Sequence, residues 1–305
     1  MRSRAAAAGA IRFAPDPEGL LDRVVDWARS DGAVRALILL GSRARVDPPA
    51  DEWSDTDLIA VVPDPAAFLA DPSWPARFGS VAVTFVEQTP HGRSERRVLY
   101  ADGTDLDLVP VSIEEARTGL REPGPLSMLA RGHRILLDKD GLVADLPALI
   151  AGASTEHDQG RDWPPDAAAF GNLVSDFWYH ALWSARKLRR GELWVARACV
   201  DGYMKRLLLL IIEWQARATT DGEGDHWFDG RFLERWADTE TVRALRDCYS
   251  HYDSGDLGRG LAATMDLFRR LATDLAVRLE LPYPAGPDDA ATKLVVELLE
   301  SVRPA

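Results

Sequence analysis

The chain has 305 residues, of which 46% are hydrophobic and 28% are charged, and its formal net charge is −12. This length allows two domains of ordinary size, and the composition is that of a globular protein. The negative balance argues against a nucleic-acid backbone as the main partner, and it is compatible with a cationic small molecule.

Neither a membrane segment nor a disulfide framework is indicated by the sequence. The longest apolar run, residues 207–212, is far too short to span a bilayer. The two cysteines, Cys199 and Cys248, lie far apart and match no metal-binding spacing. The first residues carry positive charge but lack the apolar core of a signal peptide. We therefore expect a cytoplasmic protein with no membrane partner, present as a monomer or a weak homodimer.

The first half of the chain alternates strands with short helices. Residues 1–17 have the composition of a loose extension, and an amphipathic helix follows. Apolar and alternating runs predict strands at 36–40, 58–62, 80–86, 97–100, 106–111 and 133–137. We therefore expect an α+β domain over residues 18–155, with a mixed sheet and helices packed against it.

The second half has a helical pattern. Residues 151–166 are polar and contain two prolines, which indicates a domain boundary near residue 155. Apolar residues then recur every three or four positions, notably over 170–188 and 257–279, and seven of the ten tryptophans lie after residue 160. This pattern predicts an all-α helical bundle over residues 156–305, with the aromatic residues in its core.

The segment 41–62, GSRARVDPPADEWSDTDLIAVV, carries two aspartates at the start of a predicted strand. Residues two apart on a strand face the same side, so Asp55 and Asp57 share a face. Such close like charges repel one another unless a cation lies between them, and Mg²⁺ prefers oxygen ligands. A second pair, Asp105 and Asp107, stands in a later apolar strand. The two pairs predict a magnesium site that could support displacement at phosphorus.

A Gly-Ser step precedes these aspartates at the end of the first strand. Gly41 and Ser42 would let the backbone approach a phosphate closely, and Arg43 and Arg45 would add bidentate contacts. Each element alone is weak, because an Asp-x-Asp pair is more often a solvated strand end. The segment also fails the ligand spacing of an EF-hand calcium loop. The ordered combination is what makes the signal specific.

This combination resembles the nucleotidyltransferase superfamily of the DNA polymerase β type. Longer segments resemble the aminoglycoside 6-adenylyltransferase family, whose members inactivate streptomycin. They are DRVVDWARSDGAVRALILLGSRARVD, DEWSDTDLIAVVPD, DGTDLDLVPV, SDFWYHALWSARKLRRGELWVA, GRFLERWAD and LFRRLATDLAVRLELPYP. The resemblance extends over roughly residues 20–300, nearly the whole chain.

The resemblance implies ATP as co-substrate and Mg²⁺ held by Asp55 and Asp57. The third acidic position of the family precedes a proline by five residues, and counting back from Pro110 gives Asp105. We therefore expect Asp105 to be the third metal ligand and the general base. Asp107 stands where the family has a neutral residue, and it would need a partner such as an arginine to remain charged.

The second half supplies further candidates through the same resemblance. Arg186, Lys187 and Arg190 are expected to bind the triphosphate, although a solvated helix end would look the same. Asp176 is expected to pair with a guanidinium of the acceptor. An exposed pair with His180, four residues further along the same helix, explains this aspartate equally well. Glu87, near the end of the third strand, is expected to face the acceptor, although a surface charge fits equally well.

We therefore predict Mg²⁺-dependent transfer of AMP from ATP to a hydroxyl group of an aminoglycoside, with release of pyrophosphate and antibiotic resistance as the result. Streptomycin at the 6 position is the expected acceptor, and no nucleic-acid partner is expected. Three alternatives remain. One is adenylylation of another acceptor of the lincosamide type. Another is a fusion with a HEPN-like ribonuclease, because Arg246 and His251 match the R-x4-H spacing. The third is a binding module that kept the fold and lost catalysis.

Overall fold

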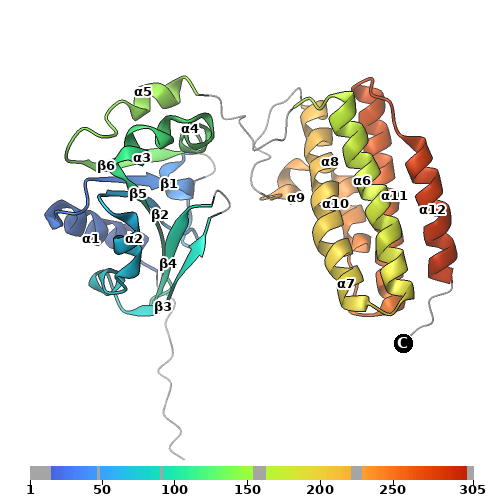
Figure 1. The fold of residues 1–305 in the computed structure, drawn as a ribbon, viewed down its shortest axis with the longest axis horizontal. Helices are drawn as coiled ribbons and strands as arrows, with labels where there is room; N and C mark the ends of the chain where they lie inside the picture. Colours follow the sequence, from blue (N-terminus) through green and yellow to red (C-terminus); the bar gives the residue numbers. More distant parts are fainter. Residues whose placement is uncertain (1–14, 47–48, 90–91, 154–162, 221–228, 301–305) are drawn as a thin grey trace, which may run out of the picture. The chain divides into compact units, whose positions relative to one another are not determined.

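The computed structural model describes residues 15–300 except for 47–48, 90–91, 154–162 and 221–228. The described residues form two separately packed units, and the division between them falls at residue 160 (Figure 1). The first unit contains a sheet with helices on both faces. The second is helical throughout its described residues.

The first unit is built on a six-stranded sheet with the strand order β3-β4-β5-β2-β1-β6. The strands are β1 (Ala36–Leu40), β2 (Asp57–Val62), β3 (Val81–Gln88), β4 (Ser94–Tyr100), β5 (Asp105–Ser112) and β6 (His133–Asp138). The sheet is mixed, as predicted, because β2 and β5 run parallel while the other neighbours run antiparallel. Each strand that the sequence predicted is present.

One face of the sheet is covered by the amphipathic helix α1 (Pro17–Ser30), together with α2 (Pro65–Ala70) and the short helix η2 (Trp74–Arg77). Helix α1 begins at a favourable N-cap, since the Asp16 side chain accepts a hydrogen bond from the Gly19 amide at 3.0 Å and Pro17 follows. Leu20 and Val24 of this helix pack in one buried cluster with Leu58, Leu106 and Leu108 of the sheet.

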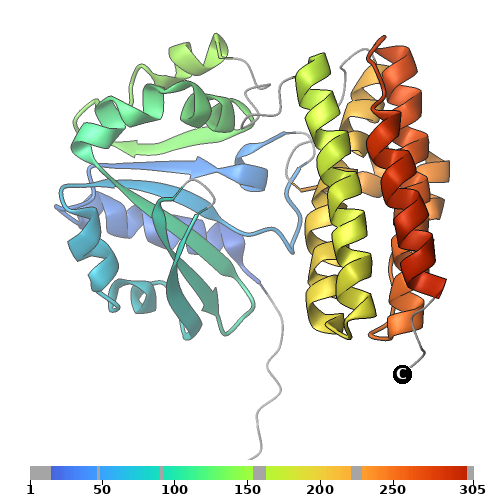
Figure 2. The same ribbon diagram turned by 45° about the vertical axis from the view of Figure 1, so that its right-hand side comes forward.

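The opposite face is only partly covered. Helices α3 (Ile113–Arg117), α4 (Pro123–Ala130) and α5 (Leu146–Ala151), with η3 (Gly119–Arg121), lie over it (Figure 2). Their buried cluster includes Ile59 and Val61 of β2 and Val111 of β5, but no described residue of β3 or β4. Val83, Phe85 and Leu99 are correspondingly exposed. This uncovered part of the sheet is where the acidic residues lie.

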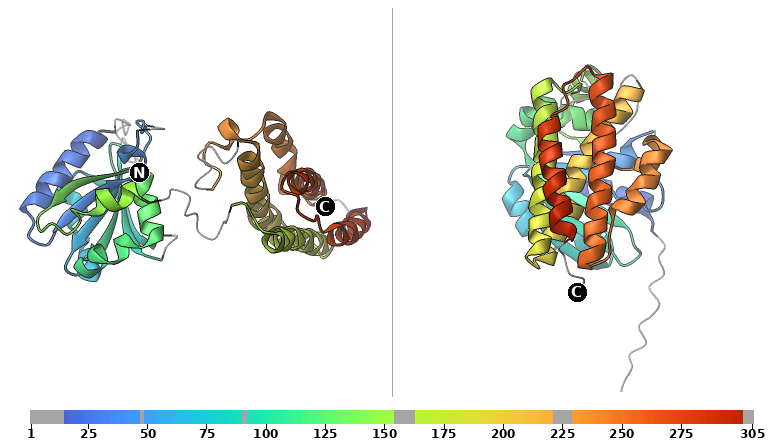
Figure 3. Two further views of the ribbon diagram at one scale, coloured as in Figure 1. Left: turned by 90° about the horizontal axis from the view of Figure 1, so that it is seen from above. Right: turned by 90° about the vertical axis from the view of Figure 1, so that its right-hand side faces the viewer.

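The second unit packs around one buried core. Its helices are α6 (Ala167–Arg189), α7 (Leu193–Ala198), η4 (Cys199–Tyr203, a π-helix), α8 (Met204–Thr219), α9 (Leu233–Trp236), α10 (Thr239–Leu245), η5 (Arg246–Cys248), α11 (Ser254–Arg278) and α12 (Ala285–Glu300). The left view of Figure 3 shows the long helices nearly end on. Phe177 of α6 stacks on Phe268 of α11 with ring centroids 3.6 Å apart. Such aromatic pairs confirm the predicted role of the apolar stripe in the core.

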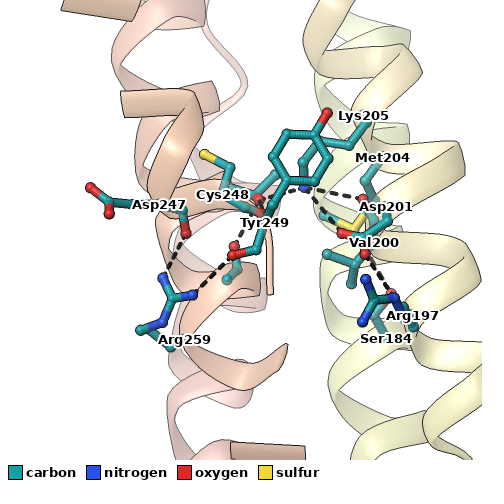
Figure 4. A network of polar contacts seen from close by, with 12 residues as sticks. Ser184, Arg197, Val200, Asp201, Met204, Lys205, Asp247, Cys248, Tyr249 and Arg259 are labelled. Carbon is teal, nitrogen blue, oxygen red and sulfur yellow. Dashed lines mark hydrogen bonds and ion pairs between the residues drawn. The ribbon is translucent and has the colours of Figure 1, made fainter. Parts of the chain in front are cut away.

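A buried polar network lies within this helical unit beside the π-helix (Figure 4). Lys205 is only 8% exposed, and its ammonium group donates to the Thr264 hydroxyl at 2.9 Å and to the Val200 carbonyl at 3.3 Å. Asp201 lies 3.9 Å from the same ammonium group and 3.2 Å from Arg197. Burial lowers the pKa of Lys205, while the charge of Asp201 opposes that shift. The network joins α8 to α11.

The described helices include none that is both long enough and apolar enough to cross a bilayer.

Candidate active site

Three carboxylates gather at the uncovered part of the sheet. Asp57 and Asp107 are paired directly across the parallel strands β2 and β5, and Asp55 lies two residues before Asp57. One oxygen atom from each carboxylate lies within 4.8 Å of the others. The backbone sets this arrangement, because the Thr56 amide donates to the Asp105 carbonyl at 3.2 Å and the Asp107 amide donates to the Thr56 carbonyl at 2.9 Å.

The carboxylate cluster differs from the sequence prediction in one position. Asp105 was expected as the third ligand, but the aspartate that joins Asp55 and Asp57 is Asp107. The reason is the register: Asp107 is the residue opposite Asp57, whereas Asp105 lies one residue pair further back, about 6.6 Å along the strand. Counting from a proline could not find this register, because the pairing of β2 with β5 depends on long-range hydrogen bonds.

Electrostatic strain in this cluster is large. Burial, together with the charges of Asp55 and Asp107, raises the pKa of Asp57 to about 7. Burial likewise raises the pKa of Asp107 to about 7, although Arg97 opposes the shift. The pKa of Asp105 is raised by burial and by the charge of Asp55. Carboxylates held together at such a cost at neutral pH are typical of a site that binds a cation.

The three carboxylates fit Mg²⁺. Oxygen atoms bound to one octahedral Mg²⁺ are about 3 to 4.2 Å apart, and the three carboxylates each have an oxygen within 4.8 Å of the others, so small side-chain movements would bring them onto a shared ion. The donor set is also suitable, since Mg²⁺ binds carboxylate oxygens and leaves positions for phosphate oxygens and water. Asp55, Asp57 and Asp107 are therefore the residues that would hold the metal.

Arg97 is the cation that the sequence analysis left unnamed. It lies opposite Asp107 on the antiparallel strand β4, with its Nε atom 3.5 Å from the Asp107 carboxylate. The same nitrogen lies 2.6 Å from Glu87 and 3.1 Å from Glu95. Glu87 and Glu95 are themselves directly opposed on β3 and β4, a pairing that is unfavourable without a cation. Arg97 is therefore an arginine partner of Asp107 of the kind that the sequence predicted. It also pairs with Glu87, the residue that was expected to face the acceptor.

The residue pattern of β4 contained a signal for this group. Side chains alternate between the two faces of a strand, so Glu95 and Arg97 of β4 face the same side. Glu95 is only 7% exposed, which is unusual for a carboxylate. The sequence pattern of this strand predicted only a hairpin, and it did not distinguish Glu95 or Arg97 as site residues.

The Gly-Ser step lies against the carboxylates, as its role requires. Gly41 begins the short helix η1 (Gly41–Ala44) at a φ of +68°, a conformation that favours glycine. A Cβ atom on Gly41 would lie 2.2 Å from a carboxylate oxygen of Asp57, so no side chain fits there. Ser42 is 4% exposed, and its hydroxyl has no hydrogen-bond partner among the described residues. A buried hydroxyl without a partner, one residue after the glycine that lies against Asp57, is a suitable donor to a phosphate oxygen.

The two arginines after this step are engaged within the protein. Arg43 donates through Nη2 to the carbonyl oxygens of Asp51 and Ser54, and so it ties the loop before Asp55 to η1. The Cγ atom of Arg45 would clash with a Cβ atom on Gly132, at 2.3 Å, which shows how closely this side chain passes the backbone there. Neither arrangement supplies evidence for the bidentate phosphate contacts that the sequence analysis expected.

The candidates in the helical unit are also largely paired there. Lys187 donates to Glu192 at 2.7 Å, and Arg190 lies 2.5 Å from the other oxygen of the same carboxylate. Arg186 is exposed on α6. Asp176 accepts a hydrogen bond from the Tyr203 hydroxyl at 2.7 Å. It also lies 2.7 Å from His180, the neighbour four residues on.

The R-x4-H pair spans the end of a helix. Arg246 is exposed in η5, and His251 lies in the segment before α11 with its ring nitrogen 2.9 Å from Asp256. The side chain of His251 is 96% exposed. This position does not add support for a ribonuclease site.

Comparison with known proteins agrees with the motifs. The family model described as Streptomycin adenylyltransferase matches residues 16–298. A curated aminoglycoside 6-adenylyltransferase of Bacillus subtilis is 23% identical over 296 residues, which are 93% of this chain and 98% of the relative. One of Campylobacter jejuni is 23% identical over 275 residues, 86% of this chain and 89% of the relative. A crystal structure of an aminoglycoside 6-adenyltransferase from Bacillus subtilis covers 93% of this chain and 99% of its own, with 19% identity and a TM-score of 0.46.

The chain therefore belongs to the streptomycin adenylyltransferase family, as its motifs predicted. It is a nucleotidyltransferase enzyme.

Proposed function

We propose that this enzyme transfers AMP from ATP to a hydroxyl group of an aminoglycoside, with streptomycin at its 6 position as the acceptor, and that the modification confers resistance. Family membership supports adenylyl transfer, and the names of the relatives support an aminoglycoside acceptor. The observation that carries the proposal is the cluster of Asp55, Asp57 and Asp107 against Gly41. The cluster provides a site for a cation, and the backbone at Gly41 lies directly against it.

In this proposal Asp55, Asp57 and Asp107 hold Mg²⁺, whose charge offsets that of the triphosphate and of the departing pyrophosphate. Gly41 lets the backbone of η1 lie directly against Asp57, and the Ser42 hydroxyl bonds to a phosphate oxygen. The acceptor oxygen forms the new bond to the α-phosphorus and the bond to pyrophosphate breaks. The hydroxyl proton passes to a carboxylate of the cluster of Asp55, Asp57 and Asp107 rather than to Asp105, the base that the sequence led us to expect. Positioning and charge neutralisation supply most of the rate, as in other phosphoryl-group transfers.

We assign Arg97 the role of keeping Asp107 charged and oriented, since it is the cation opposite that residue. We also retain Arg186, Lys187 and Arg190 as triphosphate contacts and Asp176 as an acceptor contact. Their support is the family resemblance alone. ATP binding would require Lys187 and Arg190 to exchange Glu192 for phosphate oxygens, which are also anionic.

Mass spectrometry tests the proposed reaction directly. The enzyme is incubated with Mg²⁺ and ATP and with streptomycin, other aminoglycosides or a lincosamide in separate reactions. We expect a mass gain of one AMP on streptomycin, with none when Mg²⁺ is chelated or when Asp57→Asn replaces the wild type. AMP on the lincosamide alone would overturn the choice of acceptor. Cleavage of RNA without ATP would favour the ribonuclease alternative, and binding without any turnover would favour the binding module.

A further inference from the structure

A cavity of about 150 Å³ opens beside the aspartate cluster. Its walls include Arg43, Glu52, Trp53, Leu99 and Asp105. Two separate parts of the chain therefore meet around it: the loop that precedes Asp55, and the turn between β4 and β5. None of these wall residues belongs to the set of three carboxylates that fits Mg²⁺.

The cavity adjoins the catalytic cluster through β5. Asp105 and Asp107 lie two residues apart on this strand and so face the same side of the sheet. Leu99 lies opposite Asp105 on β4, in the same way that Arg97 lies opposite Asp107. A molecule that placed a hydroxyl group at the cluster could therefore extend directly into the cavity.

The chemistry of the walls is anionic and apolar. Trp53 is 69% exposed and Leu99 is 39% exposed, which leaves apolar surface open to a ligand. Glu52 and Asp105 are exposed carboxylates, and among the described residues the Asp105 carboxylate has neither a hydrogen bond nor an ion pair within 4 Å. Arg43, the one cation among the described residues of the wall, donates instead to carbonyl oxygens of the loop before Asp55.

We propose that this cavity is the subsite for a cationic group of the acceptor, a guanidinium or a protonated amine, and that Asp105 is the residue that selects for it. This inference rests on the function proposed above, and it adds the position in the structure at which a cationic group of the acceptor binds. A cation gains both from the carboxylate and from the face of the Trp53 indole. An adenine base could stack on Trp53 and donate its exocyclic amine to Asp105, but it is neutral and would not offset the negative charge of Asp105 and Glu52. The volume suits one such group of an antibiotic rather than the whole molecule.

Steady-state kinetics of Asp105→Asn test the subsite. We expect the KM for streptomycin to rise about 10- to 100-fold, the loss of one charge-assisted hydrogen bond. The KM for ATP and the kcat should stay within about threefold, because the metal site is intact. Trp53→Ala should raise the KM for streptomycin about two- to fivefold, and Trp53→Phe should recover most of that loss. Asp26→Asn is the matched control, since it removes the same charge from an exposed position on α1.

Two kinetic results would overturn the inference. A raised KM for ATP with an unchanged KM for streptomycin would place the nucleotide in the cavity. A collapse of kcat, together with loss of Mg²⁺-induced thermal stabilisation, would make Asp105 a metal ligand.

Calorimetric titration with streptomycin in the absence of ATP separates this inference from the proposed function. Weaker binding by Asp105→Asn than by the wild type would support the subsite even if the wild type transferred no AMP to streptomycin, a result that would refute the function alone. Equal binding by both proteins, with AMP transfer by the wild type, would refute the subsite alone. No binding by the wild type would refute both.

Discussion

Asp57 and Asp107 lie directly opposite each other on the parallel strands β2 and β5. Two carboxylates in this relationship are unfavourable for the fold, and they become useful only when a cation binds between them. Burial is the main reason why the pKa values of both residues are raised to about 7, and the charge of Asp107 adds to the shift at Asp57. The register between β2 and β5 also determines which aspartate of β5, Asp105 or Asp107, lies beside Asp57.

The first prediction concerns that third carboxylate. We expect Asp107→Asn to lower kcat at least about 100-fold, because it removes one anionic ligand of the metal and leaves a near-isosteric amide. Asp105→Asn should keep its kcat, as argued above. Single-turnover rates at saturating ATP and streptomycin measure the difference. An active Asp107→Asn beside an inactive Asp105→Asn would show that the proline-based alignment is correct and the register argument is not.

The second prediction concerns pH and metal. The pKa values of Asp57 and Asp107 are raised from an ordinary value near 3.8 to about 7 in the folded protein. Between these values the folded state binds more protons than the unfolded state, so the free energy of unfolding of the metal-free protein falls as the pH rises through this window. Mg²⁺ binds the deprotonated carboxylates and reverses the loss.

We therefore expect Mg²⁺ to raise Tm more at about pH 8 than at about pH 6. Thermal melts with and without Mg²⁺ across this range provide the measurement. The double variant Asp57→Asn with Asp107→Asn should show almost no Mg²⁺ effect at either pH. A stabilisation by Mg²⁺ that was equal at both pH values in the wild type would contradict the assignment of these carboxylates as its ligands.

The third prediction concerns Gly41. Alanine there would place a Cβ atom 2.2 Å from an Asp57 oxygen, at a φ of +68°. We expect Gly41→Ala to cost about 1–2 kcal/mol of stability for the backbone conformation alone, and to abolish activity because Asp57 must move. Gly191→Ala is the matched control, since Gly191 has a φ of +76° and no atom within 4 Å of a new Cβ atom. Equal loss of activity in the two variants would refute a specific contact with Asp57.

The fourth prediction concerns the buried network of the helical unit. Lys205→Met should destabilise the protein by about 3–5 kcal/mol, because it leaves the Asp201 carboxylate without one of its two cations. Adding Asp201→Leu removes the carboxylate that Lys205→Met leaves with Arg197 as its remaining ion-pair partner, so the double variant should be more stable than Lys205→Met alone. Denaturant unfolding measures both. A double variant that was no more stable than the single one would show that Lys205 acts through packing rather than through charge.

The local pattern of the sequence was sufficient to predict the strands of the sheet and the face that Asp55 and Asp57 share. Apolar alternation located all six strands of the sheet, and the step of two along a strand placed Asp55 and Asp57 on one face. The Gly41-Ser42 step was also recognisable from adjacent residues alone, because it directly follows an apolar strand. Both features involve residues that are close in sequence. Local backbone geometry alone decides which face of a strand such residues occupy and where the chain turns.

Only the tertiary structure decided which strands lie side by side and in which register. Asp107 rather than Asp105 lies opposite Asp57 because of amide hydrogen bonds between residues about fifty positions apart, beginning where Thr56 pairs with β5. The position of Arg97 opposite Asp107 depends in the same way on the pairing of β4 with β5. Periodicity assigns a side chain to a face, but a shift of two residues keeps that face and moves every partner. The energy of the whole sheet, rather than the pattern of any one strand, therefore selects the residues that meet.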